Sequence, residues 1–359
     1  ALARRPGHLD ALLALEPLYR RVGSLEALRG VYGALARALT DPGVEMLVPS
    51  MGAYPTQAFA AILRRAGIRA RALPVPGEDA LLLGRGHCAC KECLPFLLTS
   101  GAFLKDLARE RDPDAVSLLF MAAGNGPCRL GQYGRALGDL IARERLRNVA
   151  VFSLSDENGY AGLGRRVLLS SWQALVLTDV LSDIRSLLAV AARDPEGALA
   201  ELDSAWQSFL GVLEHAPQGE FSRRLTGLAQ RIGRIPLARD PRETPVISLV
   251  GEIYVRRDEF SRRHPVRFLQ ERGFMVRIAP ASEYLSYTNH LINRGLRDRA
   301  LPARRRIEAR LVALAQEWWE RRIRRIMAQS GLCFHRPAPI GSIIRNVSHL
   351  LDPNFRCET

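Results

Sequence analysis

The stretch VEMLVPSMGAYPTQAFAAILRRAGIRARALPVP, residues 44–76, decides the fold. Its first part, VEMLVPS (44–50), is a short apolar run of the kind that forms a buried strand. PTQAFAAILRRAG (55–67) has helical periodicity and ends in Gly67, a residue type that commonly terminates helices. IRARALPVP (68–76) indicates a second strand. This spacing predicts a crossover unit in which the two strands run parallel.

The same alternation continues along the next part of the chain. We expect strands at 115–122 and 149–155, and helices at 96–109 and 131–145. Residues 44–164 are therefore predicted to form an α/β domain, with ligand-binding loops at the carboxyl ends of its strands.

The remaining segments complete the predicted organisation. Residues 1–43 carry helical periodicity and precede the first domain, and 165–240 have long helical patterns without strand signals. Strand patterns at 245–255 and 274–280 predict a second α/β domain over 241–359. The expected fold class is thus α/β, with two Rossmann-like parallel-sheet domains and a helical insertion between them.

Two helices are expected in the second domain. One covers 265–272 and begins at Pro265, because proline is favoured at the first position of a helix. The other covers 303–328, with its arginines on the solvated side. Its predicted core face contains Ile307, Leu311, Leu314, Trp318, Ile323 and Ile326.

Four of the six cysteines lie within 86–133. Cys88, Cys90 and Cys93 have C-x-C-x-x-C spacing, and Cys128 follows a predicted strand. Thiolates on such loops suit an iron–sulfur cluster or zinc, and we interpret the group as an iron–sulfur site. A zinc site and buried structural thiols are the alternatives.

Residues around these cysteines have two interpretations each. His87 could bind a metal or hydrogen-bond a sulfur, or it could be solvated. Arg129 could raise the potential of an anionic cluster, or it could be a surface residue. Glu252 could line a crevice or cap a turn. Three glycines would make room for Cys128 and its ligand, namely Gly124, Gly126 and Gly131.

Composition restricts the class of protein. The 359 residues suggest two or three domains, and 47% hydrophobic with 25% charged residues is the profile of a soluble globular protein. No apolar run is long enough to span a bilayer, and six cysteines are too few for a secreted disulfide framework. We expect a cytoplasmic protein without a membrane partner.

The net charge of +14 raises the question of nucleic-acid binding. Only two of the 51 basic residues are lysine, a bias typical of a GC-rich genome. Residues 291–330 alone carry eleven arginines and four acidic residues. We therefore disfavour a nucleic-acid partner.

Several motifs together resemble one protein family. The chain is similar, over most of 44–355 and in the same order, to the activase-associated, dehydratase-like proteins of the 2-hydroxyacyl-CoA dehydratase and benzoyl-CoA reductase superfamily. The motifs that carry this resemblance are KECLPF (91–96), GPCRLGQY (126–133), SLSDENGYAGLG (153–164), VGEIYVRRDEFS (250–261) and the tail QSGLCF…SHLLDPNF.

The resemblance implies an iron–sulfur cluster, usually 4Fe–4S, held by cysteines from several loops. Cys93 and Cys128 match the two motif cysteines, whereas Cys88 and Cys90 lie outside the motif as extra ligands or incidental thiols. The resemblance also implies that an ATP-hydrolysing activase supplies low-potential electrons. This activase is an upstream domain or a partner, and ATP would bind only to the activase. The implied acceptor is an acyl-CoA, and a homodimer or heterodimer is compatible with this class.

The chain departs from the family at its end. Family members continue past Arg356 to a further cysteine loop, so we expect a fragment, with Cys333 and Cys357 as weak substitutes for the missing ligand. The resemblance leaves open whether the chain is a dehydratase or reductase component or its activator. The second hypothesis is a non-catalytic zinc-binding or metal-free module that docks through its helices and the arginine-rich segment 291–330.

Overall fold

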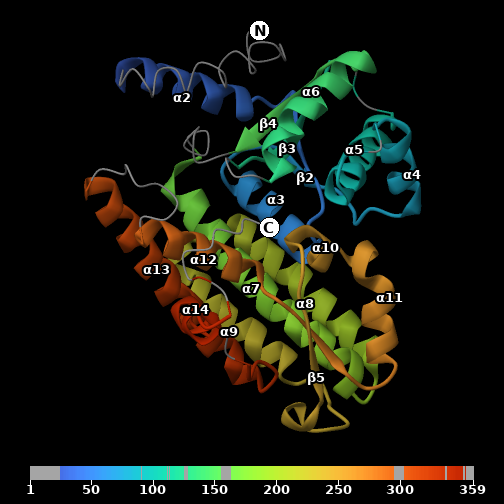
Figure 1. Cartoon of the computed structure of the whole chain (residues 1–359), viewed down its shortest axis with the longest axis vertical. Coiled ribbons are helices and arrows are strands. Elements are labelled where there is room, and N and C mark those ends of the chain that lie inside the picture. Colours follow the sequence, from blue (N-terminus) through green and yellow to red (C-terminus); the bar gives the residue numbers. More distant parts are fainter. Residues whose placement is uncertain are drawn as a thin grey trace. The chain divides into compact units, whose positions relative to one another are not determined.

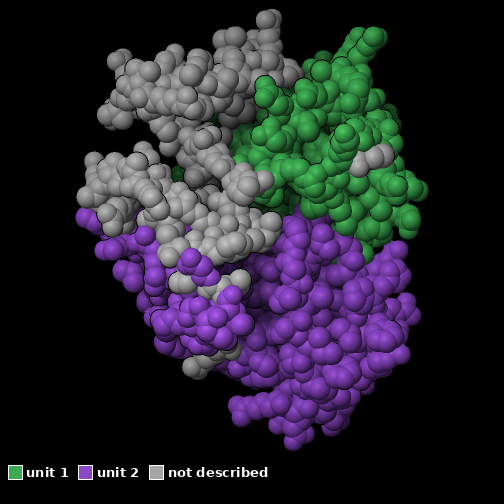
Figure 2. Space-filling model, viewed as in Figure 1, with its two compact units in different colours: residues 1–169, 258–260 green, residues 170–257, 261–359 purple. Residues whose placement is uncertain are grey.

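A computed structural model of the chain describes residues 25–89, 91–110, 112, 114–124, 128–154, 163–294, 303–335, 338–350 and 352, and only the backbone of 25–30, 32 and 303–306. The chain divides into two compact units, which Figure 2 distinguishes by colour. Unit 1 contains residues 1–169 and 258–260. Unit 2 contains residues 170–257 and 261–359.

Unit 1 is built on a four-stranded parallel sheet (Figure 1). Its strands are β1 (Val44–Val48), β2 (Ala70–Ala72), β3 (Val116–Ala122) and β4 (Val149–Leu154), in the order β2-β1-β3-β4. Every neighbouring pair is parallel, so the predicted α/β class and crossover unit are confirmed. The second strand is shorter than predicted.

Helices cover both faces of this sheet. Met46 and Leu118 belong to one core cluster with residues of α2 (Leu25–Leu39) and α3 (Ala53–Arg65). Leu47 and Leu119 belong to the other, with residues of α5 (Leu94–Leu107) and α6 (Tyr133–Arg143). Burial on both faces explains why β1, β3 and β4 are mostly apolar rather than strictly alternating.

A helix that the sequence did not predict lies directly before the cysteine loop. This helix, α4 (Glu78–Gly86), contacts α5. A Cβ placed on Gly84 would lie 1.9 Å from the carbonyl oxygen of Leu97, and one on Gly101 would lie 1.8 Å from that of Ala80. Glycine is therefore needed at both positions because the two backbones approach closely.

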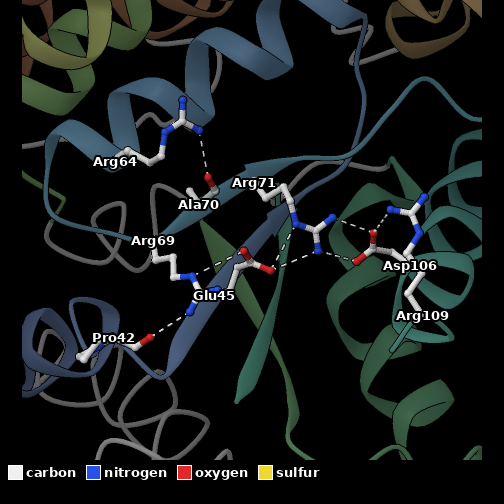
Figure 3. A network of polar contacts seen from close by, with 8 residues as sticks. All are labelled: Pro42, Glu45, Arg64, Arg69, Ala70, Arg71, Asp106 and Arg109. Carbon is white, nitrogen blue, oxygen red and sulfur yellow. Dashed lines mark hydrogen bonds and ion pairs between the residues drawn. The ribbon is translucent and has the colours of Figure 1, made fainter. Parts of the chain in front are cut away.

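A polar network joins α5 to the sheet, as Figure 3 shows. Arg71 on β2 donates two hydrogen bonds of 2.8 Å to the carboxylate of Asp106 on α5, and it also donates to Glu45 on β1 at 3.1 Å. The Asp106 side chain is only 7% exposed, and hydrogen bonding to it raises the pKa of Arg71, which stays charged. The network fixes α5, whose N-cap is Cys93, against two strands.

Unit 2 is mostly helical. α8 (Pro195–His215) and α13 (Ala303–Met327) both contact α9 (Phe221–Ile232), and the side chains of Trp206, Phe209 and Ile323 are buried. The long helix α7 (Gly164–Ala191) enters this unit at Ser170. The helical prediction for this part of the chain is confirmed.

A two-stranded parallel sheet completes unit 2, formed by β5 (Val246–Leu249) and β6 (Met275–Ile278). Asp179 of α7 organises the connections, because it pairs with the buried Arg257 and accepts backbone hydrogen bonds from Ala281 and Ser282 at 3.2 and 2.9 Å. The remaining helices are α10 (Ile253–Arg257), α11 (Glu259–Gln270), α12 (Ala281–Asn293) and α14 (Ile340–Val347), with short 3-10 turns at Arg129–Gln132, Gln218–Glu220, Pro241–Glu243 and Ala328–Ser330.

Two predictions for the last third of the chain were wrong in detail. The strand expected at 245–255 ends at Leu249, and the helix expected to begin at Pro265 begins at Glu259 and contains the proline.

The predicted core face of α13 was wrong at four of its six residues, whereas Ile323 is buried as predicted. The four are among the most exposed apolar side chains described: Ile307 58%, Leu311 61%, Leu314 62% and Trp318 53%. The side that packs inward contains Gln316, Trp319 and Ile323, where the Gln316 carbonyl accepts from Trp172 Nε1 at 3.0 Å and the Trp319 ring meets Phe221. Consecutive residues of a helix point about 100° apart, so apolar residues at neighbouring positions lie on different faces. The sequence of α13 contains two apolar faces, and only one of them is buried.

Among the described residues, no helix combines the length and the apolar character that crossing a membrane requires.

Candidate functional site

The topology of unit 1 defines where a ligand site would lie. The chain moves from β1 to β2 on one side and then returns across β1 to β3, so the winding reverses between β1 and β3. Loops at the carboxyl ends of strands flanking such a reversal form the usual ligand crevice of open α/β sheets. Cys128 follows β3 at this point, and Cys93 lies on the connection from β2 to β3.

Cys93 occupies the N-cap position of α5. Its carbonyl oxygen accepts hydrogen bonds from the amides of Phe96 at 3.0 Å and Leu97 at 3.3 Å, and Pro95 stands in the first turn, where it is well tolerated. The thiol is half-buried and forms a short hydrogen bond with the hydroxyl of Tyr133. Cys93 therefore connects the start of α5 with the start of α6.

Cys128 lies immediately before a 3-10 turn that leads into α6. Its sulfur accepts a hydrogen bond from the amide of Leu130 at 3.5 Å, in the manner of an N-cap. The side chain is exposed, so it can be reached by a metal or a reagent.

The loops that carry the two motif cysteines adjoin. Arg129, next to Cys128, donates a short hydrogen bond to the carbonyl oxygen of Lys91, two residues before Cys93. The carboxylate of Glu92 accepts from the amides of Ala89 and Lys91, both at 3.1 Å. The hydrogen bond from Ala89 lowers the pKa of Glu92, so this carboxylate stays ionised and orders the loop.

The structure separates Cys88 from the start of α5. Its sulfur lies 4.0 Å from the hydroxyl of Ser100, seven residues along the helix from Cys93, which corresponds to about 10 Å of helical rise. Cys88 therefore lies beside the second turn of α5 and packs against the core of unit 1. Cys90 lies outside the described residues.

His87 and Glu252 have structural partners. His87 contacts the carbonyl oxygen of Leu83 through Nδ1 at 2.9 Å, and its Nε2 lies 3.7 Å from the carboxylate of Glu144. Glu252 accepts a hydrogen bond of 2.8 Å from the amide of Val255, so it caps α10.

Of the glycines in the Cys128 loop, Gly131 has a steric role, whereas a Cβ on Gly124 would meet nothing within 4 Å. A Cβ on Gly131 would lie 2.4 Å from the carbonyl oxygen of Gly124, so Gly131 allows the turn to close against the end of β3. Gly126 lies outside the described residues.

These residues do not make a complete ligand set. In the part of the chain that the structure describes, no three or more His, Cys, Asp or Glu side chains are arranged to hold a metal ion. Cys333 lies in unit 2, where burial raises the pKa of its thiol to about 11, which makes it an unreactive cysteine. Cys357 lies outside the described residues.

Sequence reasoning missed Tyr133 as the partner of the Cys93 thiol. The residue stands in the quoted motif GPCRLGQY, but a short-range pattern does not show a contact across 40 residues. It also missed a cavity in unit 2, because the residues that line it are dispersed over about 100 positions.

Comparison with protein-family models, with curated proteins and with solved structures gives no match. The resemblance to the dehydratase superfamily rests on the quoted motifs.

Proposed function

We propose that this chain is an iron–sulfur electron-transfer protein of the 2-hydroxyacyl-CoA dehydratase type. It receives low-potential electrons from an ATP-hydrolysing activase and passes them to an acyl-CoA acceptor. When bound, a 4Fe–4S cluster would supply one-electron chemistry that no amino-acid side chain offers.

One observation supports this proposal above all others. The contact between Arg129 and the Lys91 carbonyl oxygen holds together the loops of Cys93 and Cys128, at the edge of the sheet where such folds bind ligands. Tyr133 holds the Cys93 thiol beside the start of α6, and Cys128 remains exposed. The interpretation of 44–164 and 241–359 as two Rossmann-like domains with a helical insertion between them belongs to the same proposal.

The described residues provide only part of the ligands that the proposal requires. Cys93 and Cys128 would be two of them, and further thiols would come from Cys88 or from outside the described residues, where Cys90 is the nearest in sequence. Cluster binding would also require the Cys93 thiol to lose its proton, after which its sulfur would accept the hydrogen bond from the Tyr133 hydroxyl. Arg129 would then contribute positive charge beside an anionic group.

Serine substitutions of single cysteines test the proposal. We expect Cys93→Ser and Cys128→Ser each to lose most of the iron that the parent protein binds after anaerobic reconstitution, because serine is a poor ligand for iron in such clusters. Cys333→Ser is the matched control, since its thiol is unreactive and lies in the other unit. Iron content that survives both substitutions would contradict the proposal.

A second candidate function is a metal-free interaction module. One observation favours it: α13 exposes a stripe of four large apolar side chains. This function predicts that the cysteine substitutions change neither metal content nor partner binding.

A further inference from the structure

Unit 2 contains a large cavity that the proposed function does not use. Its volume is about 930 Å³, which is within the range of small-molecule sites. The walls are formed by residues of α12, of α13 and of the segments 331–335 and 338–341. Ligands of such sites are bound by a few polar groups that converge on the cavity.

The described residues that line the cavity carry an excess of positive charge. There are five arginines and three glutamates, a formal excess of two positive charges with the histidines neutral. Two of the arginines are neutralised, since Arg321 pairs with Glu317 at 2.8 Å and Arg324 pairs with Glu320 at 3.0 Å. Within the described part of the chain, no ion pair engages the remaining three, which are Arg242, Arg294 and Arg325.

The cavity is also lined by buried polar atoms without partners. The Nε2 atoms of His290 and His335 and the Oδ1 atom of Asn293 are buried and have no hydrogen-bond partner among the described residues. Burial lowers the pKa of both histidines, so each imidazole is neutral at pH 7 and can donate or accept one hydrogen bond there. Buried polar groups are normally satisfied, so these three atoms indicate a polar molecule that the cavity accommodates.

The wall that carries these atoms is held in place. Asn289 donates a hydrogen bond of 2.6 Å from its amide to the side chain of Gln316, which joins α12 to α13 across the cavity. The start of α12 is fixed by its two amide hydrogen bonds to Asp179. A site with fixed walls loses little entropy when a ligand binds.

We propose that this cavity binds an organic dianion, with its oxyanion groups paired to Arg294 and Arg325 and its neutral polar part bonded to His290, His335 and Asn293. Two charges match the excess on the lining, and both phosphate monoesters and dicarboxylates carry them at neutral pH. Arginine suits both because its planar fork matches their oxygens. The proposal requires no metal and goes beyond the electron-transfer function, so either can fail without the other.

Calorimetric titration of the full chain tests this inference. The probes are glycerol 3-phosphate and succinate, with glycerol as the uncharged control. We expect one binding site per chain for at least one of the two dianions and no binding of glycerol. The dianion that binds more tightly shows whether the cavity prefers a phosphate or a carboxylate.

Two variants of one helix give the matched comparison. Arg325→Ala removes an arginine of the cavity lining that makes no ion pair with the described residues, whereas Arg310→Ala removes an arginine of α13 that does not line the cavity; both side chains are exposed. Loss of a charge-assisted contact weakens binding by about tenfold or more, so we expect that loss for Arg325→Ala and no change for Arg310→Ala.

Asn293→Leu supplies a second readout. Replacing an unsatisfied buried amide by an apolar group of similar size should raise the melting temperature of the free protein while it weakens dianion binding. Absence of binding by both dianions, or equal weakening by Arg325→Ala and Arg310→Ala, would overturn the proposal.

Discussion

The close contact between α4 and α5 makes Gly101 the most sensitive small residue of unit 1. A Cβ at this position would lie 1.8 Å from the carbonyl oxygen of Ala80 and 2.8 Å from the amide nitrogen of Gly84. Both neighbours are backbone atoms, so Gly101→Ala requires the helices to separate by roughly 1.5 Å to reach ordinary van der Waals distance. Overpacking of this kind costs about 1–3 kcal/mol and occasionally more, against a gain of about 1 kcal/mol in helix propensity.

We therefore expect Gly101→Ala to lower the free energy of unfolding by up to about 2 kcal/mol. Urea denaturation measures the effect as a lower midpoint at an unchanged slope. Gly138→Ala is the control, because Gly138 lies in α6 with nothing within 4 Å of a Cβ, and its substitution should raise stability by about 0.5–1 kcal/mol. A Gly101→Ala protein that is stabilised as much as the Gly138→Ala protein would refute the close approach of the two helices.

Three further predictions concern stability. Leu311→Ser on the exposed stripe of α13 should change the free energy of unfolding by less than about 0.5 kcal/mol. Ile323→Ala on the buried side of the same helix should lower it by about 2–5 kcal/mol. Equal losses for the two variants in urea denaturation would mean that the helix packs by its other face. Asp106→Asn should cost about 1–3 kcal/mol by weakening the pairing with Arg71, and the exposed Asp139→Asn should cost nothing measurable by the same assay. Burial raises the pKa of Asp183 from 3.8 to about 7 although Arg277 lies 3.6 Å away, so its contribution to stability is full below about pH 4 and lost as the pH rises through 7. The free energy of unfolding of Asp183→Asn should therefore rise relative to that of the parent between pH 4 and 7, by at most roughly 4 kcal/mol. Denaturation followed across pH measures this difference. A difference that does not change with pH would show that the carboxylate is ionised in the folded protein.

The parallel sheet could be predicted because its determinants are local. β1, β3 and β4 are mostly apolar runs, and the helix between β1 and β2 is followed by Gly67, whose φ is +82°. Strand periodicity and a left-handed glycine after a helix are both visible in a short window of sequence.

Other features depend on contacts between distant segments and could not be predicted. The helix α4 was not predicted, and within it Gly84 serves to admit the backbone of α5. The face of α13 was misassigned because the choice between its two apolar stripes is made by Trp172 and Phe221, which lie about 100 residues or more away in the sequence.

The candidate site could also be predicted only in its local features. The positions of Cys93 and Cys128 on loops before helices follow from the residues beside them, such as Pro95 and Gly131. The hydrogen bond between Cys93 and Tyr133 and the contact of Cys88 with Ser100 depend on how α5 and α6 pack, which the spacing of the cysteines does not encode.

The content of iron and acid-labile sulfide after anaerobic purification and reconstitution tests the central claim most directly. The account predicts about four of each per chain, with a broad absorption band that bleaches on reduction, as expected of a thiolate-bound 4Fe–4S cluster. Zinc at about one ion per chain would instead assign the cysteines a structural role. A colourless protein that binds no iron under these conditions would contradict the electron-transfer function.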